Sequence, residues 1–151
     1  MEIKKIDLSK LDNNEMETFN IFYRLRFHKE YLSNNTSKFK TTKKKSHEWF
    51  TNNNFKKWIF SINLKDRKKT FIGGIIYDRE NFFYSILIQK KYRKKGHAEV
   101  ALKKLINVVK RKKLKLFTYL KKKNLPSINL HKKYIKYKKK YNKDFYWVRL
   151  V

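Results

Sequence analysis

The chain has 151 residues, enough for one domain with a hydrophobic core, and carries 41 Lys and Arg against 12 Asp and Glu, a formal charge of +29. Such a balance first suggests a nucleic-acid-binding protein. The lysines, however, are spread over every segment and accompany many Asn, Ile, Phe and Tyr residues, the set that A- and T-rich codons favour. We therefore expect attraction of anionic ligands and weak polyanion binding, and no specific nucleic-acid partner.

Several classes of site are excluded by the residues that the chain lacks. It has no cysteine, which excludes disulfides, Cys-ligated zinc and a covalent Cys–acyl intermediate. The histidines are dispersed without metal-ligand spacing, so we predict no metal; they are His28, His47, His97 and His131. No apolar run has the length of a membrane span, and the amino terminus does not resemble a signal peptide. We expect a cytoplasmic protein without a membrane partner.

The first third of the chain predicts one strand and two helices. Residues 2–6 can form a short strand. Asp12 and Glu15 form a capping box, and apolar residues at helical spacing then predict a helix from about residue 13 to 27. Thr42 can cap a second helix that ends near residue 52.

Three strands in antiparallel hairpins are predicted next. Residues 58–64 alternate between apolar and polar side chains, as a strand with one buried face does. The strand over 70–77 contains Gly73-Gly74, a pair that suggests a bulge or a close backbone approach. A polar turn over 78–81 leads into the near-continuous apolar run 82–89, which is typical of a buried strand.

The stretch 93–98, Arg-Lys-Lys-Gly-His-Ala, joins this strand to a helix. From Ala98 to Val109 apolar residues recur at three- and four-residue spacing, which predicts an amphipathic helix. Gly96 gives the backbone the freedom that a tight strand-to-helix turn needs. The first amides of the helix have no partner within it, so this turn predicts a phosphate-binding site, beside which three basic residues add charge.

The last third of the chain predicts a parallel strand, a helix and a hairpin. The strand over 114–120 follows a helical crossover and is therefore parallel to 82–89. A helix begins near Asn124, with Pro126 in its first turn. Residues 136–141 and 145–151 can form the final hairpin.

Two of these stretches resemble the GNAT superfamily of acyl-CoA-dependent N-acyltransferases. The pattern Arg-x-x-Gly-x-Ala over 93–98 is similar to the arm that binds the coenzyme pyrophosphate. After the next strand, Asn-x-x-Ser-x-x-Leu-His-x-Lys over 124–133 is similar to the helix beside the pantetheine and the thioester. The resemblance covers nearly the whole chain as one domain, residues 1–151. It implies an α/β fold with a central mixed, largely antiparallel sheet, a splayed pair of parallel strands and flanking helices.

The resemblance also implies a reaction and a set of site residues. The reaction is direct transfer of an acetyl group from acetyl-CoA, the cosubstrate, to a primary amine in a ternary complex without a metal. His131 lies where the family commonly has a Tyr that serves the leaving thiolate. The implied coenzyme-binding residues are Ile86, Leu87, Ile88, Arg93, Lys94, Lys95, Gly96, His97, Ala98, Asn124 and Ser127.

The acceptor and the base are less defined. A second helix ending in Trp49-Phe50, with both motifs, resembles the N-acetyltransferases of pseudaminic-acid-type pathways, which implies a nucleotide-linked amino sugar as the acceptor. Ribosomal-protein or other protein N-terminal acetyltransferases share the layout, and a non-catalytic basic module for RNA or another polyanion is the alternative from another class. Arg26 either meets an anionic acceptor or is solvated. For the amine's proton, Glu48, Glu80 and a water chain are all open.

Two further points stay open at the sequence level. The family usually ends the pantetheine helix with Leu-Gly-Phe, whereas this chain has Tyr134-Ile135-Lys136 and lacks the glycine of a common helix-ending turn. His131 precedes two lysines, so it either faces the thioester or lies at the surface. The chain can be a monomer or a homodimer.

Overall fold

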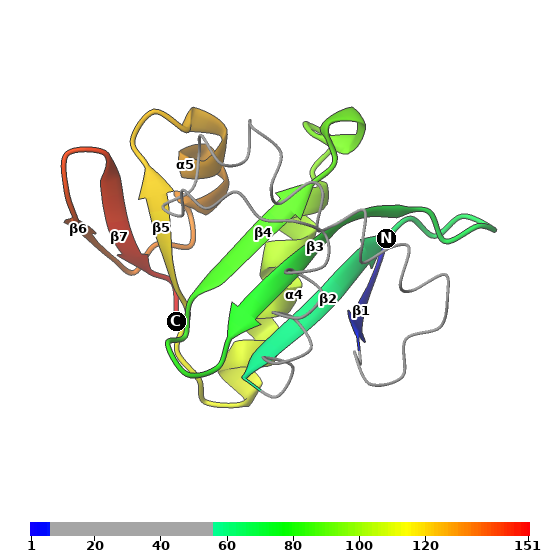
Figure 1. The fold of residues 1–151 in the computed structure, drawn as a ribbon, viewed down its shortest axis with the longest axis horizontal. Helices are drawn as coiled ribbons and strands as arrows, with labels where there is room; N and C mark the ends of the chain where they lie inside the picture. The colour runs from blue at the N-terminus through cyan, green and yellow to red at the C-terminus, as the bar shows by residue number, and fades with distance from the viewer. Residues whose placement is uncertain (7–55) are drawn as a thin grey trace, which may run out of the picture.

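A computed structural model describes residues 1–6 and 56–151, so the predicted helices over 13–27 and 42–52, with Arg26, Glu48 and Trp49-Phe50, lie outside the described residues. Two antiparallel sheets are present in the described part (Figure 1). In chain order the elements are β1 (Glu2–Ile6), β2 (Lys57–Asn63), β3 (Phe71–Asp78), β4 (Tyr84–Ile88), the 3₁₀ turn η2 (Lys90–Tyr92), α4 (His97–Arg111), β5 (Phe117–Lys121), α5 (Leu125–His131), β6 (Tyr137–Lys140) and β7 (Phe145–Arg149).

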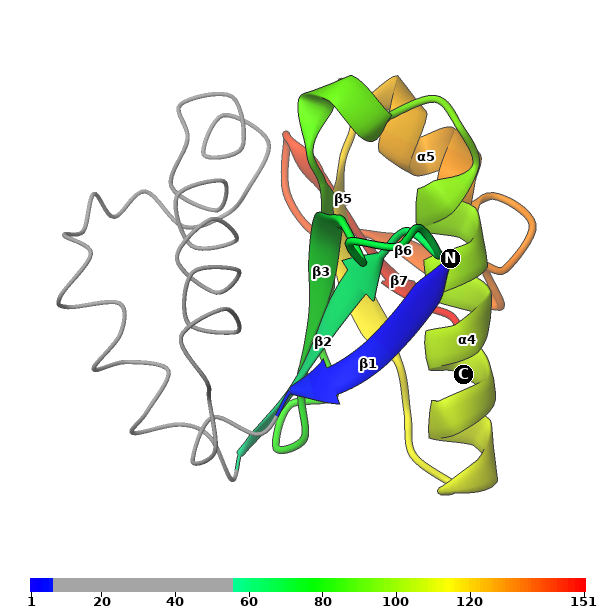
Figure 2. The same cartoon turned by 90° about the vertical axis from the view of Figure 1, so that its right-hand side faces the viewer.

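The larger sheet has the order β1-β2-β3-β4, and α4 covers one of its faces (Figure 2). Trp58, Tyr77 and Tyr84 lie opposite one another across three strands and so point to the same face. The apolar stripe predicted for α4 packs against this face and is buried; it consists of Ala101, Leu102, Leu105, Ile106 and Val109. The sheet face and the helix stripe together form the main hydrophobic core.

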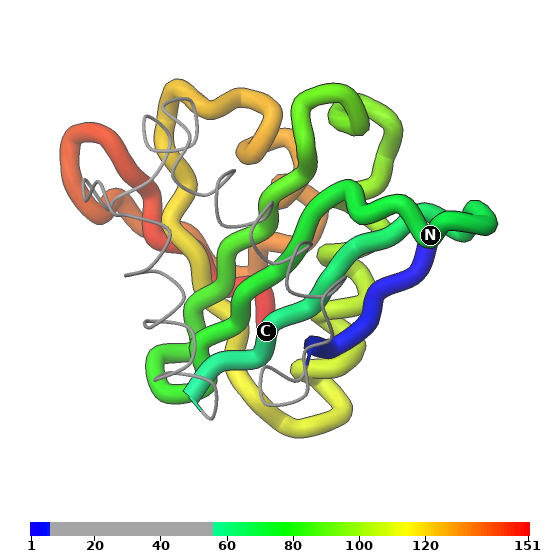
Figure 3. Tube along the Cα trace, turned by 45° about the vertical axis from the view of Figure 1, so that its right-hand side comes forward, coloured from blue at the N-terminus to red at the C-terminus, as the bar shows by residue number. Residues whose placement is uncertain are grey.

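The smaller sheet, β5-β7-β6, is joined to the larger one through a splayed strand pair. β5 is parallel to β4, and the pairing is limited to one bridge between Phe83 and Phe117. The amide of Phe117 donates to the carbonyl of Phe82 at 2.8 Å, and the Thr118 hydroxyl donates to the carbonyl of Tyr84 at 3.3 Å. Beyond these bonds the strands diverge toward their carboxyl ends (Figure 3). The predicted α/β fold with a splayed parallel pair is confirmed.

Gly73 lies where three strands crowd together. The register between β2 and β3 shifts after Ile62, which marks the predicted bulge. A Cβ atom built on Gly73 would lie only 2.1 Å from the carbonyl oxygen of Leu87 on β4. Both alternatives that the glycine pair suggested, a bulge and a close backbone approach, are therefore found at Gly73.

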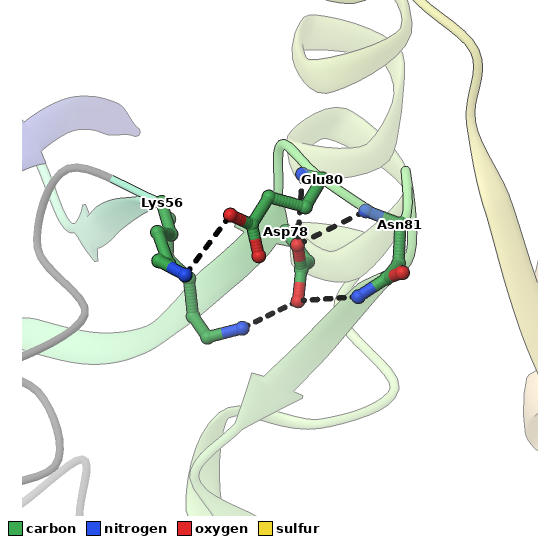
Figure 4. Close-up of polar contacts among 5 residues, drawn as sticks. Lys56, Asp78, Glu80 and Asn81 are labelled. Atoms are coloured by element: carbon green, nitrogen blue, oxygen red, sulfur yellow. Dashed lines mark hydrogen bonds and ion pairs between the residues drawn. The ribbon is translucent and has the colours of Figure 1, made fainter.

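The turn between β3 and β4 is held by Asp78 (Figure 4). Its carboxylate accepts hydrogen bonds from the amides of Glu80 at 3.0 Å and Asn81 at 3.2 Å, and it forms an ion pair with Lys57. Burial opposes ionisation of Asp78, but these bonds dominate and lower its pKa. Glu80 itself pairs with Lys56 at 3.1 Å on the outside of the turn.

Two strands begin two or three residues later than predicted. The run 82–89 gives a strand only from Tyr84 to Ile88, because Phe82 adopts a left-handed conformation with φ of 60°. The strand predicted from residue 114 begins at Phe117, because the chain before it pairs with the carboxyl terminus through the carbonyl of Leu116 and the amide of Leu150.

The chain leaves α5 without the family glycine. The amide of Tyr134 bonds the carbonyl of His131 at 2.8 Å, and the Tyr134 hydroxyl donates to Glu99 on α4 at 3.2 Å. Ile135 packs against the core, and the amide of Lys136 then joins β7 by bonding to Arg149. Side-chain contacts thus close the turn that a glycine commonly closes, and β6 and β7 form the predicted hairpin.

His131 attaches α5 to the larger sheet. It is only 2% exposed, so the alternative that placed it at the surface is wrong. Its Nδ1 donates to the carbonyl of Ser127 at 2.6 Å, since a carbonyl can only accept. Nε2 must then accept a hydrogen bond from the hydroxyl of Tyr84, and burial raises the pKa of that hydroxyl well above its ordinary value. Burial also lowers the pKa of His131, more than the Ser127 bond raises it, so the imidazole is neutral.

The buried His131 predicts acid-sensitive stability. Because the folded pKa lies below the ordinary value of 6.5, the unfolded chain binds the proton more tightly. The stabilisation that the neutral imidazole contributes is complete above pH 6.5 and is lost as the pH falls through the folded pKa. We expect the Tm to fall on acidification below pH 6.5, and to fall less in His131→Gln, which keeps a donor and an acceptor but does not titrate. Parallel pH profiles of the two proteins in calorimetry would contradict a titrating His131.

Candidate functional site

The gap between β4 and β5 exposes backbone groups of β4. Antiparallel strands bond through alternate residues, and the bonds of Phe83 and Gln89 to β3 fix which residues of β4 face that strand. Leu87 is therefore bonded to β3 and does not offer its backbone to the gap, contrary to the sequence-based expectation. The backbone groups of Ile86 and Ile88 point the other way, toward β5, which has already diverged. Polar backbone groups in such a gap need a partner, and a ligand with amide groups can supply it.

The chain that follows β4 continues beyond the carboxyl end of the strand as η2 and a tight turn that leads into α4. The Arg93 side chain is held back against the strand, because its Nε donates to the carbonyl of Ile88 at 2.9 Å. Lys94 and Gly96 have φ angles of 60° and 76°, so the chain reverses direction twice before α4 begins. The freedom predicted for Gly96 is thus used: it is the N-cap of α4 in a left-handed conformation.

This turn presents a series of backbone amides to solvent. Within the described part of the chain, no backbone acceptor bonds the amides of the five residues Lys94, Lys95, Gly96, His97 and Ala98. They lie at the positive end of a helix of 15 residues, and no atom lies within 4 Å of where a Gly96 side chain would start. Free amides, a helix dipole and flanking lysines are what an anionic phosphate group requires. The residues predicted to bind a pyrophosphate are therefore brought together around one open turn.

The start of α5 lies on the β5 side of the gap and is capped by Asn124. The Oδ1 atom of Asn124 accepts a hydrogen bond from the amide of Ser127 at 3.2 Å, so this oxygen serves the helix. The Nδ2 group of Asn124 has no recorded acceptor in the described part of the chain and can still bond a ligand carbonyl. Ser127 contributes chiefly through its carbonyl, which orients His131.

His131 and Tyr84 connect the two sides of the gap near its closed end. Tyr84 begins β4, and its carbonyl accepts the Thr118 hydroxyl of β5, while its side chain reaches His131 of α5. Both imidazole nitrogens are hydrogen-bonded in this arrangement. His131 can donate to a ligand only if Tyr84 gives up its bond to Nε2, so the two side chains form one unit. The sequence analysis missed Tyr84 and Thr118; a tyrosine at a core-facing position of an apolar strand was the available signal.

Of the two carboxylates suggested as bases, Glu80 does not fit this gap, and Glu48 lies outside the described residues. Glu80 lies in the β3–β4 turn, at the opposite end of β4 from η2 (Figure 1), and is paired with Lys56. The nearest carboxylate to the phosphate turn in sequence is Glu99, in the first turn of α4. It bonds Lys133 and Tyr134, and these bonds lower its pKa despite the opposing effect of burial. β4 and β5 carry no carboxylate side chain.

The described residues contain neither a metal-binding cluster nor a membrane-spanning helix. No group of three or more His, Asp or Glu side chains in residues 1–6 and 56–151 lies close enough together to hold a metal ion. No helix in these ranges is both long and apolar enough to cross a bilayer.

Several solved structures share the fold of this chain at low sequence identity. A ribosomal-protein-alanine N-acetyltransferase from Brucella melitensis superposes with a TM-score of 0.68 at 16% identity, covering 99% of this chain and 97% of that one. The N-acetyltransferase PseH from Campylobacter jejuni, in complex with acetyl coenzyme A, gives 0.67 at 18% identity and covers 99% and 98%. A spermidine N-acetyltransferase from Vibrio cholerae, in complex with CoA and spermine, gives 0.72 at 12%, covering 98% and 92%. At these identities the likeness establishes the fold.

The family itself is established from the sequence. A search of curated proteins returns no match. The model of the acetyltransferase (GNAT) family, however, matches residues 22–137, well over half of the chain and including both the phosphate-binding turn and α5. The protein is therefore an acyltransferase that belongs to the acetyltransferase (GNAT) family.

Proposed function

We propose that the protein is an acetyl-CoA-dependent N-acetyltransferase that transfers acetyl directly to a primary amine in a ternary complex. The observation that carries the proposal is the placement of the phosphate-binding turn at the carboxyl end of β4, where the backbone of Ile86 and the amide of Ile88 face a gap instead of a neighbouring strand. A pyrophosphate at the amides of 94–98 leaves the pantetheine arm to run along β4 toward Tyr84. No other described part of the chain combines an anion site with a strand edge in this way.

Each part of the gap has a distinct role in this proposal. The amides of the turn bind the pyrophosphate, and the flanking lysines neutralise it. Ile86 and Ile88 pair with the amides of the pantetheine as a neighbouring strand would. One of their N–H groups can also hold the thioester oxygen as negative charge develops on it during attack by the amine.

His131 is the proposed catalytic group for the leaving thiolate, acting together with Tyr84. Its neutral imidazole has one N–H, on Nδ1, fixed to Ser127, and its Nε2 accepts from Tyr84. When thiolate forms beside this pair, the Tyr84 hydroxyl can turn to it as a hydrogen-bond donor, or Nε2 can take the proton that the attacking amine loses and pass it to the thiolate. A substitution can distinguish the two donors, because Tyr84→Phe removes the hydroxyl and keeps the aromatic ring.

For the acceptor we propose a nucleotide-linked amino sugar. A formal charge of +29 draws a polyanionic nucleotide toward the site and repels a polycation, so a polyamine acceptor of the spermine kind is disfavoured. The likeness to PseH supports this choice, as does the helix end predicted from the sequence at Trp49-Phe50, which lies outside the described residues. A protein N-terminal acceptor is the second candidate, supported by the likeness to the Brucella enzyme. Arg26, outside the described residues, remains a candidate for contact with an anionic acceptor.

The phosphate-binding turn is tested by a matched pair of substitutions at Gly96. Asn and Asp both tolerate a left-handed conformation, and space is open at this position, but only Asp adds negative charge. Gly96→Asp should weaken coenzyme A binding in calorimetry at least about tenfold, on the order of 1.4 kcal/mol. Gly96→Asn should weaken it less. Coenzyme A affinity equal to that of the parent in Gly96→Asp would remove the turn from the coenzyme site.

The pair of His131 and Tyr84 is tested by kinetics. His131→Ala should lower kcat by about one to three orders of magnitude, with coenzyme A affinity within a few-fold of the parent. Tyr84→Phe frees Nε2 for the thiolate and should cost less than about tenfold. A larger loss in Tyr84→Phe than in His131→Ala would identify the Tyr84 hydroxyl as the donor. Parent-like turnover of His131→Ala would exclude a catalytic role for His131.

The acceptor is tested by mass spectrometry of amines incubated with acetyl-CoA and the protein. We expect a mass gain of one acetyl group on a nucleotide-linked 4-amino sugar, and less than about one tenth of that rate on spermidine or on an alanine-ending peptide. Acetylation of the peptide alone would establish the second candidate. Acetyl transfer to none of the amines, with coenzyme A bound, would contradict the proposed acceptor classes and leave the coenzyme site intact.

A further inference from the structure

A cavity lies near the β1 edge of the larger sheet, whereas the β4–β5 gap lies at the opposite edge. It occupies about 380 Å³ between β1, β2, β3 and the carboxyl-terminal half of α4. Its apolar lining consists of Ile3, Phe60, Ile75, Leu105 and Val108. Figure 2 shows β1 running away from α4 along its length, so the helix does not close over this edge of the sheet. The lining includes no residue of the phosphate-binding turn, β5 or α5, and this cavity is therefore separate from the proposed coenzyme site.

The polar lining of the cavity is basic on every side. Lys5 comes from β1, opposite Phe60, and Lys104 and Arg111 lie two turns apart on the same side of α4. Among the described residues, no carboxylate lines the cavity. Within the described residues neither Lys104 nor Arg111 has an ion pair, whereas the neighbouring Lys103 is 3.7 Å from Glu99. Asn107, between the two cations, adds a hydrogen-bonding amide.

The cationic field extends beyond the rim. The Nζ of Lys5 lies 5.5 Å from the centre of the Trp58 ring, and Arg79 and Lys112 lie at 5.4 and 5.6 Å from the same ring. The indole attracts these cations, but it is neutral and does not neutralise the charge of Lys5 and Lys112. An apolar cavity beside uncompensated positive charge favours a ligand with an apolar body and one anionic end.

We propose that this cavity binds a medium-chain carboxylate, a fatty acid with a single unbranched chain. Its carboxylate pairs with Arg111 and Lys104, and Arg111 offers a planar fork that matches two carboxylate oxygens. Its chain lies on Phe60, Ile75 and Val108. A volume at the lower end of ligand-pocket sizes suits one chain and not a two-chain lipid. Because unfilled apolar space weakens a core, a ligand that fills it stabilises the fold.

The proposal is tested by direct binding with three probes that share a ten-carbon chain. Decanoate, decanol and decyltrimethylammonium are titrated below their aggregation concentrations, with calorimetry and thermal shift as readouts. We expect saturable binding of one decanoate with a rise in Tm, binding of decanol at least tenfold weaker, and none of the cationic probe. Equal affinity for decanoate and decanol would overturn the charged-end assignment.

Matched variants of α4 locate the binding. Arg111→Glu should weaken decanoate binding at least tenfold, whereas Lys110→Glu, the same charge change on a residue outside the lining, should leave it within two-fold. Val108→Trp fills the cavity and should abolish binding, whereas Val100→Trp on the exposed side of the same helix should not. A cooperative unfolding transition confirms that each variant folds. Equal losses in Lys110→Glu and Arg111→Glu, or parent-like binding in Val108→Trp, would overturn the proposal. None of these readouts depends on coenzyme A or on acetyl transfer.

Discussion

The separation of β4 from β5 is the constraint on which the rest of this structure depends. A parallel pair normally continues for the length of its strands, but here the pairing ends at the bridge between Phe83 and Phe117. Phe82, in a left-handed conformation that a bulky residue rarely adopts, sets the entry into β4 and offers its carbonyl to Phe117. The strands then part, and the backbone of Ile86 and the amide of Ile88 face the gap, while the carbonyl of Ile88 accepts from Arg93. Strain of this kind persists where surrounding structure enforces it, and it is common at functional sites.

The elements around the gap keep it open from both sides. On the β4 side, the missing side chain of Gly73 lets β3 lie so close to β4 that a Cβ atom would collide with the Leu87 carbonyl. This close pairing holds β4 to the larger sheet. On the β5 side, the antiparallel pairing with β7 holds β5 to the smaller sheet. His131 connects the two halves through Tyr84 without filling the gap. Neither strand can shift toward the other without breaking bonds within its own sheet.

Local patterns carried most of the fold prediction. The strands, the amphipathic helix, the Pro126 helix start and the final hairpin each had a periodicity or a turn residue that predicts them. Strand ends were less predictable: nothing in the run of Phe82 to Ile88 indicates that its first residue is left-handed. The tight turn before α4 was predictable because a glycine placed between a strand and a helix is typical of a turn with a left-handed residue.

The parts that failed depended on contacts distant in the sequence. The two lysines after His131 left a surface position open as an alternative, but Tyr84, 47 positions away, draws the imidazole into the core. Leu87 was grouped with its neighbours because the run is uniformly apolar, and only the register with β3 shows which residues face the gap. The helix end after α5 was open because its closure depends on Glu99 of another helix. Long-range partners of this kind leave no periodic signal in one sequence.

The high positive charge attracts anions in general, and the neutral groups beside each cation decide which anion is favoured there. Lysines occur along most of the chain, and several are already compensated, as Lys133 is by Glu99 and Lys57 is by Asp78. At the amino end of α4 the charges flank free amides, and this favours a compact phosphate. At its carboxyl end Arg111 borders an apolar cavity, and this favours an anion with an apolar chain. In the two proposals the neutral groups near each end of α4 therefore decide which anion binds there, because charge alone attracts both equally.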